Sequence, residues 1–391
     1  MKVAYITYPH FLDTCIERIK ELSTKVDLYV YVMIAPYSLK STVAEFTVEY
    51  NENQLLYELD EIATNEDINK LYPYFKNCKE VKFVMMPEKS LSFRAVERVS
   101  KFKRAIHEIS PNIIHLQEPA IILWSMARFL KKYPVVMSIH DTQPHTGESS
   151  WRKNFIKKLL FKSADTFELY SEYSTNEFIS TFKIDKTRVL STELLPYTIY
   201  KTFAPITVDL PIDFEKEKVI LFYGRISKYK GVEFLMESFQ KLQETTKNVK
   251  LIIAGKSNYQ LQIPEKCKDL IDKSIFILNR YIHNGEVTFL MKNSDILVCP
   301  YTDATQSGVI MTAISFEIPV IVSNMGALPE QVQKYNCGYV MKDYNVDILF
   351  SLLSESINTG KRERKFNCST VIDKTITKIL TEYKRLESNN R

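Results

Sequence analysis

Short runs of β-branched and aromatic residues alternate along the chain with longer segments of helical period, and this alternation constrains the fold more than any other feature. The runs are VAYIT (3–7), LYVYVM (28–33), NIIHL (112–116), PVVMSIH (134–140), KVILFYG (218–224), VKLIIAG (249–255), IFIL (275–278), DILVCP (295–300) and PVIVS (319–323). Strands that alternate with helices are typical of parallel sheets covered by helices on both faces. The sequence therefore predicts an α/β protein built from Rossmann-like units.

The length of the chain predicts two such units. It has 391 residues, of which 45% are hydrophobic, so more than one core can be buried. The stretch TFAPITVDLPIDFEKEK holds two prolines and shows no helical period, and we place the interdomain linker there. The predicted parts are a first Rossmann-like domain (1–201), the linker (202–217), a second Rossmann-like domain (218–365) and a C-terminal helix (366–391).

The final helix is predicted from its apolar face. Ile372, Ile376, Ile379, Leu380 and Tyr383 recur at helical spacing. Such a stripe is buried against another element in a folded protein. We therefore expect this helix to dock on another surface of the molecule.

The net charge and the cysteine spacing give no indication of a nucleic-acid-binding or metal-binding protein. The formal net charge of +5 calls for no nucleic-acid partner, although it is compatible with anionic small molecules and acidic lipid surfaces. The six cysteines form no CxxC pair and no Cys/His group of metal-ligand spacing, which favours reduced thiols. The first residues fit a buried strand better than a signal peptide, and no stretch reaches the roughly 20 apolar residues that span a bilayer. We expect a cytoplasmic protein.

The stretch LFYGRISKYKGVEFL gathers cations where a helix begins. Arg225 and Lys230 follow a predicted strand and the turn at Gly224, with Lys228 between them and Lys218 slightly earlier. Each lysine at a helix N-terminus costs roughly 0.3–1 kcal/mol unless an anion lies nearby. Because helix N-termini at the carboxyl edge of a parallel sheet bind phosphates, this pattern predicts a diphosphate clamp. The alternative is a solvated basic turn.

This part of the chain resembles the retaining glycosyltransferases of the GT-B fold, the large family 4 group. GRISKYKG is similar to their G-R-x-x-x-x-K-G motif, and further similar segments are PNIIHLQEP, SIHDTQPHTGE, LIIAGKSN, DILVCPY and TQSGVIMTAISFEIPVIVSNMGALPE. The resemblance implies two Rossmann-like domains facing each other across a cleft, with a C-terminal helix crossing back to the first domain. It also implies that Arg225 and Lys230 are catalytic, because they grip the diphosphate of a nucleotide-sugar donor and offset its charge as it leaves.

A second helix start is predicted to contribute to donor binding. All nine glycines lie at or after Gly147, so any glycine-dependent phosphate site belongs to the second domain. Thr305 or Ser307 is a candidate N-cap, and Gly308 lets backbone approach a ligand; the alternative is a purely structural cap. The predicted donor-binding residues are Gly224, Arg225, Lys230, Gly255, Thr305, Gln306, Ser307, Gly308 and Thr312.

Two glutamates that the family carries in this segment are missing. Alignment on Pro319 puts Ala304 and Thr312 at their positions. The second of these glutamates binds the nucleotide ribose in the family. Thr305, Gln306 and Ser307 are candidates to supply replacement hydrogen bonds.

His140 is the predicted catalytic residue of the first domain. It follows the strand PVVMSI together with Asp141, and the resemblance implies that it contacts the donor sugar near the reacting carbon. Since both follow strand carboxyl ends, His140 and Arg225 are expected to face each other across the cleft. A local His-Asp turn is the alternative.

The other histidines carry weaker predictions. His145 lies on the same loop as Glu148, and His10 ends the first strand; both are predicted to contact the acceptor. His115 matches a common family histidine, but a buried, hydrogen-bonded histidine is the favoured interpretation.

The sequence WRKNFIKKLLFK (151–162) has five cations and no acidic residue. This composition suggests peripheral contact with an anionic membrane, on the inner face of the cell membrane. Apolar and basic residues do not separate cleanly on a helical wheel, so a solvated face is the alternative.

The predicted function is transfer of a hexose, with retention, from a nucleotide-diphosphate donor to a glycan or lipid-linked acceptor in surface polysaccharide or glycolipid synthesis. No D-x-D motif occurs, so we expect no metal and no other cofactor, and Arg225 and Lys230 take the electrostatic role of a metal. Two rivals stay open: a catalytically degenerate relative that binds a nucleotide sugar or a partner enzyme, and a GT-B epimerase or phosphorylase.

Overall fold

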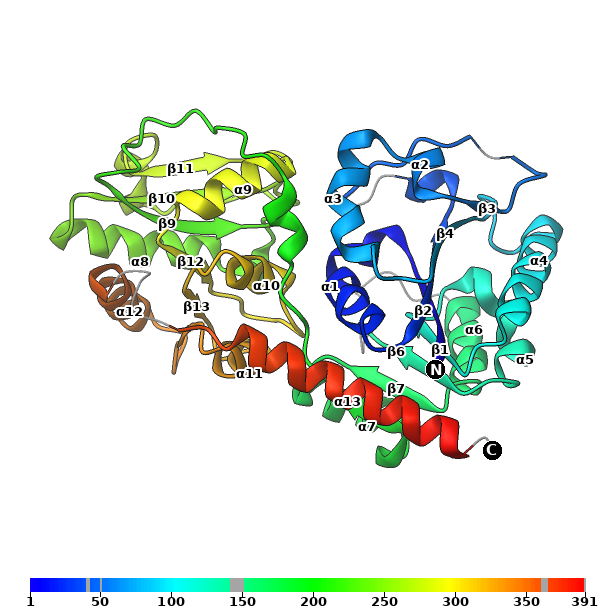
Figure 1. Ribbon diagram of the computed structural model, residues 1–391. Coiled ribbons are helices and arrows are strands. Elements are labelled where there is room, and N and C mark those ends of the chain that lie inside the picture. The colour runs from blue at the N-terminus through cyan, green and yellow to red at the C-terminus, as the bar shows by residue number, and fades with distance from the viewer. Residues whose placement is uncertain (40–42, 50, 141–150, 360–364, 390–391) are drawn as a thin grey trace. The chain divides into compact units, whose positions relative to one another are not determined.

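A computed structural model describes residues 1–39, 43–49, 51–140, 151–359 and 365–389, and the side chains of 151–154 are not part of the description (Figure 1). The predicted residues Asp141, His145 and Glu148 lie outside this part of the chain. The described chain forms two compact units, Met1–Leu195 with Ile372–Arg391, and Pro196–Val371. Residues 202–217, interpreted as a linker, are grouped with the second unit.

The first unit contains an eight-stranded sheet in the order β3-β4-β2-β1-β5-β6-β7-β8. Its strands are β1 (Lys2–Thr7), β2 (Asp27–Ile34), β3 (Leu56–Tyr57), β4 (Glu80–Met85), β5 (Ile113–Gln117), β6 (Val135–Ser138), β7 (Thr166–Leu169) and β8 (Val189–Ser191). Neighbouring strands are parallel, except that β3 pairs antiparallel with β4. The strand order reverses between β1 and β5, and ligands of open α/β sheets bind at the carboxyl ends of such strands.

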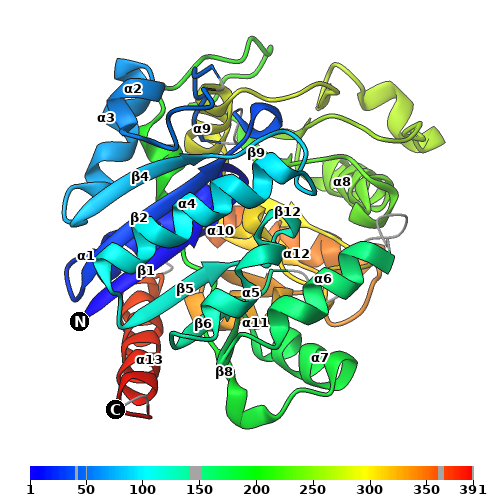
Figure 2. The same cartoon turned by 90° about the vertical axis from the view of Figure 1, so that its right-hand side faces the viewer.

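Helices cover both faces of this sheet. They are α1 (Leu12–Ser23), α2 (Leu59–Ile62), α3 (Asn65–Phe75), α4 (Phe93–Ile109), α5 (Ala127–Leu130), α6 (Trp151–Phe161) and α7 (Glu172–Phe182). α4, α5 and α6 lie on one face of the sheet, and α1 and α3 lie on the other (Figures 1 and 2). Burial on both faces explains why β1 is buried along almost its whole length.

The second unit has a six-stranded, wholly parallel sheet in the order β11-β10-β9-β12-β13-β14. Its strands are β9 (Lys218–Tyr223), β10 (Val249–Ala254), β11 (Ile275–Leu278), β12 (Ile296–Cys299), β13 (Val320–Val322) and β14 (Gly338–Val340). Its helices are α8 (Val232–Thr245), α9 (Asn284–Asn293), α10 (Gly308–Ser315), α11 (Leu328–Tyr335) and α12 (Val346–Thr359). Here the strand order reverses between β9 and β12, which places a second ligand-binding edge at their carboxyl ends.

The C-terminal helix, α13 (Cys368–Asn389), joins the first unit from Ile372 onward, as the sequence predicts. Ile376, Ile379 and Tyr383 are buried on its inner face. The Tyr383 hydroxyl lies 2.5 Å from Nδ1 of His115 in β5, and the Lys378 ammonium donates to the Ser191 carbonyl at 2.9 Å. The helix α13 therefore belongs to the core of the first unit.

Candidate active site

At the turn after β9, the backbones of two glycines are in close contact. Gly224 has a φ of +113°, a conformation that L side chains rarely adopt. A Cβ added to Gly255, which follows the neighbouring strand β10, would lie only 1.9 Å from the Gly224 carbonyl oxygen. The two predicted glycines thus let the loops after β9 and β10 lie directly against each other and hold Arg225 at the edge of the sheet.

Lys230 is a buried cation at this edge. Its side chain lies over the ring of Tyr301, which follows β12, with Nζ 4.8 Å from the ring centroid, and the residue is only 9% exposed. Burial lowers the pKa of Lys230, and the positive charge of Arg225 lowers it further, while Cys299 opposes the shift. Within the described residues, neither Arg225 nor Lys230 forms an ion pair with a carboxylate. No carboxylate from residues 1–39, 43–49, 51–140, 151–359 or 365–389 therefore pairs with the charge of these two cations.

The prediction that Lys218 belongs to this cation group is wrong. Lys218 begins β9 and pairs with Asp295 at 3.2 Å, while the other oxygen of that carboxylate accepts the Val219 N–H at 2.8 Å. A six-residue strand is about 20 Å long, so Lys218 lies at the opposite edge of the sheet from Arg225. Lys228 is exposed in the short 3₁₀ turn Lys228–Lys230.

The start of α10 reaches the same edge. The position that a Cβ on Gly224 would take lies 3.2 Å from the Val309 side chain and 3.4 Å from Nζ of Lys230. Ser307 occupies the N-cap position, but its side chain makes no capping hydrogen bond. Its backbone N–H instead donates to Oε1 of Gln331 at 3.2 Å. The first backbone amides of α10 thus lack a side-chain cap and lie close to the buried lysine.

Packing within the second unit accounts in part for the residue types at positions 308 and 312. A Cβ on Gly308 would meet the ring of Tyr197 at 2.8 Å, so the missing side chain makes room for a tyrosine of the same unit. Thr312, which stands where the family has its ribose-binding glutamate, is 2% exposed and donates its hydroxyl to the Gly308 carbonyl at 3.1 Å. Thr305 and Gln306 are half-buried in the loop that leads to α10. The donor-binding roles of all four residues stay predictions.

His140 lies at the carboxyl edge of the sheet in the first unit, two residues after the end of β6. Its ring stacks on Phe11 with the centroids 4.0 Å apart and the planes at 13°, and Tyr170 lies 4.9 Å away on another side. Its backbone N–H donates to the Glu118 carboxylate at 2.9 Å. Burial, reinforced by the charge of Arg18, lowers the pKa of His140 to about 3. The imidazole is therefore neutral at physiological pH.

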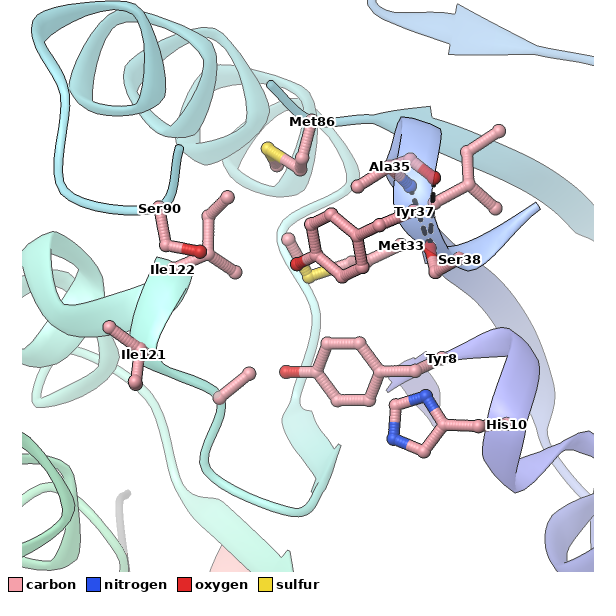
Figure 3. Close-up of a pocket in the computed structure, with 12 residues that line it drawn as sticks. Tyr8, His10, Met33, Ala35, Tyr37, Ser38, Met86, Ser90, Ile121 and Ile122 are labelled. Carbon is pink, nitrogen blue, oxygen red and sulfur yellow. Dashed lines mark hydrogen bonds between the residues drawn. The ribbon is translucent and has the colours of Figure 1, made fainter. Parts of the chain in front are cut away.

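His10 lines a cavity of about 190 Å³ at the same edge, formed by the loops after β1, β2, β4 and β5 (Figure 3). Burial lowers the pKa of His10. Its ring lies 5.6 Å from that of Tyr8 and 4.2 Å from that of Phe11. A continuous row of ring contacts thus runs along this edge of the first unit, from Tyr8 through His10 and Phe11 to His140.

Below this edge lies a buried polar network that the sequence analysis missed. Glu168 in β7 pairs with Arg18 at 3.3 Å and accepts the Ser138 hydroxyl at 2.6 Å. His115 lies 2.7 Å from that hydroxyl, and this confirms the interpretation of His115 as a buried, hydrogen-bonded histidine. The Arg18 guanidinium also lies over the ring of Tyr170, 4.8 Å from its centroid. The network anchors the tyrosine that contacts His140.

The fold is shared with solved glycosyltransferase structures. The structure of Anabaena HepE in complex with UDP and glucose matches with a TM-score of 0.61 at 15% identity, over 99% of this chain and all of the other. Two parallel-sheet units, each with a reversal of strand order, together with this likeness define a GT-B protein.

Family models identify the chain further. The model for glycosyl transferases group 1 matches residues 211–368, and that for glycosyltransferase family 4 matches residues 58–191. The chain belongs to the group 1 glycosyltransferases.

Curated relatives agree with this assignment. An uncharacterized glycosyltransferase of Methanocaldococcus jannaschii is 26% identical over 219 residues, which are 52% of this chain and 54% of that protein. The GDP-mannose:glycolipid 4-beta-D-mannosyltransferase of Xanthomonas campestris is 21% identical over 273 residues, 69% of this chain and 73% of that protein. The chain thus spans about half the length of the first relative and 73% of the length of the second.

Across the part of the chain that the structure describes, none of the helices combines the length and apolar character needed to cross a bilayer. Among the same residues, no group of three or more His, Cys, Asp or Glu side chains is placed to hold a metal ion.

Proposed function

We propose that this protein transfers a hexose from a nucleoside-diphosphate donor to a glycan or lipid-linked acceptor, with retention of anomeric configuration, in surface polysaccharide or glycolipid synthesis. Membership of the group 1 glycosyltransferases supports transfer over epimerisation or phosphorolysis. The glycolipid mannosyltransferase among the relatives, and the UDP and glucose bound by the structural neighbour, support a nucleotide sugar and a glycolipid-type acceptor.

One observation carries the proposal: beside an uncapped helix start lie a buried lysine and a neighbouring arginine, and neither has a carboxylate partner among the residues that the structure describes. An unpaired buried cation is costly, and the lowered pKa of Lys230 reflects that cost. A diphosphate would supply the missing anion to Lys230, Arg225 and the first amides of α10 together.

The proposed reaction uses these groups where negative charge develops. As the bond between the sugar and the diphosphate breaks, the leaving group gains charge, and buried Lys230, exposed Arg225 and the helix amides lower that barrier by stabilising this charge. Attack by the acceptor on the same face of the sugar, with a phosphate oxygen taking its proton, gives retention. In the proposal, neutral His140 contacts the sugar as a hydrogen-bonding group and is not a proton donor at physiological pH.

The test is product analysis with the purified chain and a panel of UDP- and GDP-sugars, with and without chelator. The expected result is sugar transfer that survives chelation, with the product anomer matching the donor anomer in NMR spectra. Restoration of activity only by magnesium or manganese would contradict metal independence. Nucleotide-sugar binding without any transfer would instead favour the catalytically degenerate alternative.

A further inference from the structure

The cavity of the first unit is apolar and uncharged. Its twelve lining residues include Met33, Met86 and Ile122, which are almost completely buried, and none of the twelve is Asp, Glu, Lys or Arg. His10 is the single titratable base among them, and its lowered pKa favours the neutral ring. The hydroxyl groups of Tyr8 and Tyr37 point toward the open space (Figure 3). A phosphate or carboxylate would find no charge partner among these twelve described residues.

Two of the five polar side chains that line the cavity, Ser38 and Tyr8, are already engaged within the described part of the protein. The Ser38 hydroxyl accepts the Ala35 N–H at 2.8 Å and donates to the Ala35 carbonyl at 3.1 Å. The Tyr8 hydroxyl donates to the Glu118 carbonyl at 3.4 Å. The other three, His10, Tyr37 and Ser90, are fewer than the hydroxyl and ring oxygens of a sugar, so a sugar ring here would bury some polar atoms unpaired, whereas a hydrocarbon group needs no partner.

The size of the cavity limits the ligand. An apolar protein cavity of about 150 Å³ binds benzene, so 190 Å³ accommodates a hydrocarbon group of roughly six to eight carbons. This is smaller than the ~300–1,000 Å³ of a complete small-molecule site. The cavity is therefore suited to one part of a larger ligand.

We propose that this cavity holds a hydrocarbon segment of an amphipathic acceptor, of the alkyl or isoprenoid class. The inference rests on the proposed transferase function and specifies its acceptor. The cavity lies beside His140, the histidine predicted to contact the donor sugar, because a row of ring contacts joins Tyr8 to His140 through His10 and Phe11. An acceptor whose hydrocarbon part enters the cavity has its polar part at this edge.

The test uses n-alkanols from butanol to decanol as probes of the full chain, so that it needs no turnover. Binding is followed through the methyl resonances of ¹³C-labelled methionines. We expect the signals of Met33 and Met86 to shift, and that of Met325, which is 37% exposed in the second unit, to stay constant. Affinity should rise about fourfold per methylene until the cavity is full at roughly six to eight carbons, and then level off.

Ala120→Phe supplies the matched variant because Ala120 is a half-buried lining residue whose enlargement fills the cavity. It should weaken hexanol binding at least tenfold, whereas Ala105→Phe, on α4 and outside the lining, should not. Affinities that do not depend on chain length, or equal binding by both variants, would overturn the proposal. Alkanol binding by a protein that transfers no sugar would support the cavity assignment while defeating the proposed function, so the two failures are distinguishable.

Discussion

The carboxylate of Glu118 accepts the backbone N–H of His140 at 2.9 Å, and Glu118 itself adopts the left-handed conformation with a φ of +52°. Glu118 follows β5 and His140 follows β6, so this bond ties together two adjacent strand ends. Left-handed backbone costs a non-glycine residue of order 1 kcal/mol, and it persists where surrounding contacts enforce it. The relationship identifies Glu118 as a residue that positions His140.

Replacing Glu118 with alanine should therefore misplace His140. We expect turnover to fall about 10–100-fold, as small misplacements of reacting groups do, with unchanged affinity for free nucleoside diphosphate. Glu118→Gln keeps an acceptor oxygen and loses the negative charge that pairs with partly exposed Lys157 at 3.7 Å, so its effect on turnover should be smaller. Steady-state kinetics and calorimetric nucleotide titrations on both variants provide the check. Equal losses in the two variants would argue against the positioning role.

Removing either cation of the proposed clamp should slow the reaction strongly. Arg225→Ala and Lys230→Ala are each expected to lower turnover about 10²–10³-fold, as loss of one charge-stabilising donor typically does. Lys228→Ala, at an exposed position in the same turn, is the matched control and should stay near the wild-type rate. Near-normal turnover in both clamp variants, measured at saturating donor, would exclude the clamp.

The lowered pKa of Lys230 predicts a characteristic response to alkaline pH. The unfolded lysine keeps its ordinary pKa of 10.5, so between the lowered folded value and 10.5 the unfolded chain binds more protons. Across that window, the contribution of Lys230 to the free energy of unfolding rises with pH, while affinity for a nucleoside diphosphate falls. Lys230→Met should remove both trends. Denaturant unfolding and calorimetric UDP titrations at several alkaline pH values measure them, and identical slopes in wild type and variant would contradict the assignment.

His140→Ala should separate a role in transfer from a role in folding. If His140 helps to hold the donor sugar, the variant loses far more turnover than affinity for the nucleoside diphosphate, whose predicted contacts lie in the second unit. A local turn histidine would instead lower the melting temperature and leave the turnover of the folded fraction intact. His107→Ala, on exposed α4 surface where the ring contacts Tyr133, serves as the control. Unchanged turnover in His140→Ala would remove this residue from the site.

Membrane contact through the basic segment 151–162 predicts salt-dependent binding to anionic vesicles. Lys158 and Lys162 are exposed, and Phe155 is 64% exposed, whereas Lys157 lies over the ring of Phe161. Each basic residue near an anionic surface contributes roughly 1 kcal/mol, which salt screens. The double change Lys158→Glu and Lys162→Glu should reduce co-sedimentation more than the equal charge change at exposed Lys131 and Lys132. Equal binding to neutral and anionic vesicles would rule out electrostatic attachment.

Much of the fold was predictable because its strands are buried on both faces. Runs such as VAYIT and KVILFYG are continuous hydrophobic segments, and they form β1 and β9 as predicted. Five strands of the described chain were not predicted: β3, β4, β7, β8 and β14. β3, β8 and β14 have only two or three residues, and β14 includes Gly338. The polar residues Glu80 and Lys82 interrupt β4, and Glu168 interrupts β7.

The sequence did not predict the rest of the site because it depends on contacts between residues that are far apart in the chain. Arg18 and Glu168 are 150 residues apart in the chain, so their ion pair follows only from the strand order. A glutamate within the apolar run TFEL was nevertheless a usable signal, since buried carboxylates are paired. Lys218 was wrongly grouped with Arg225 because the two are close in sequence, although the strand β9 separates them in space.

The bond between Tyr383 and His115 also bears on synthesis of the chain. β5 is made early, but its partner tyrosine is made only after the whole second unit has been translated. The whole second unit, Pro196–Val371, is translated in between and can fold while the first unit still lacks a helix of its core. Until then the side of the first unit that receives α13 is an uncovered surface, and a chain halted before residue 372 would keep it exposed to chaperones and proteases.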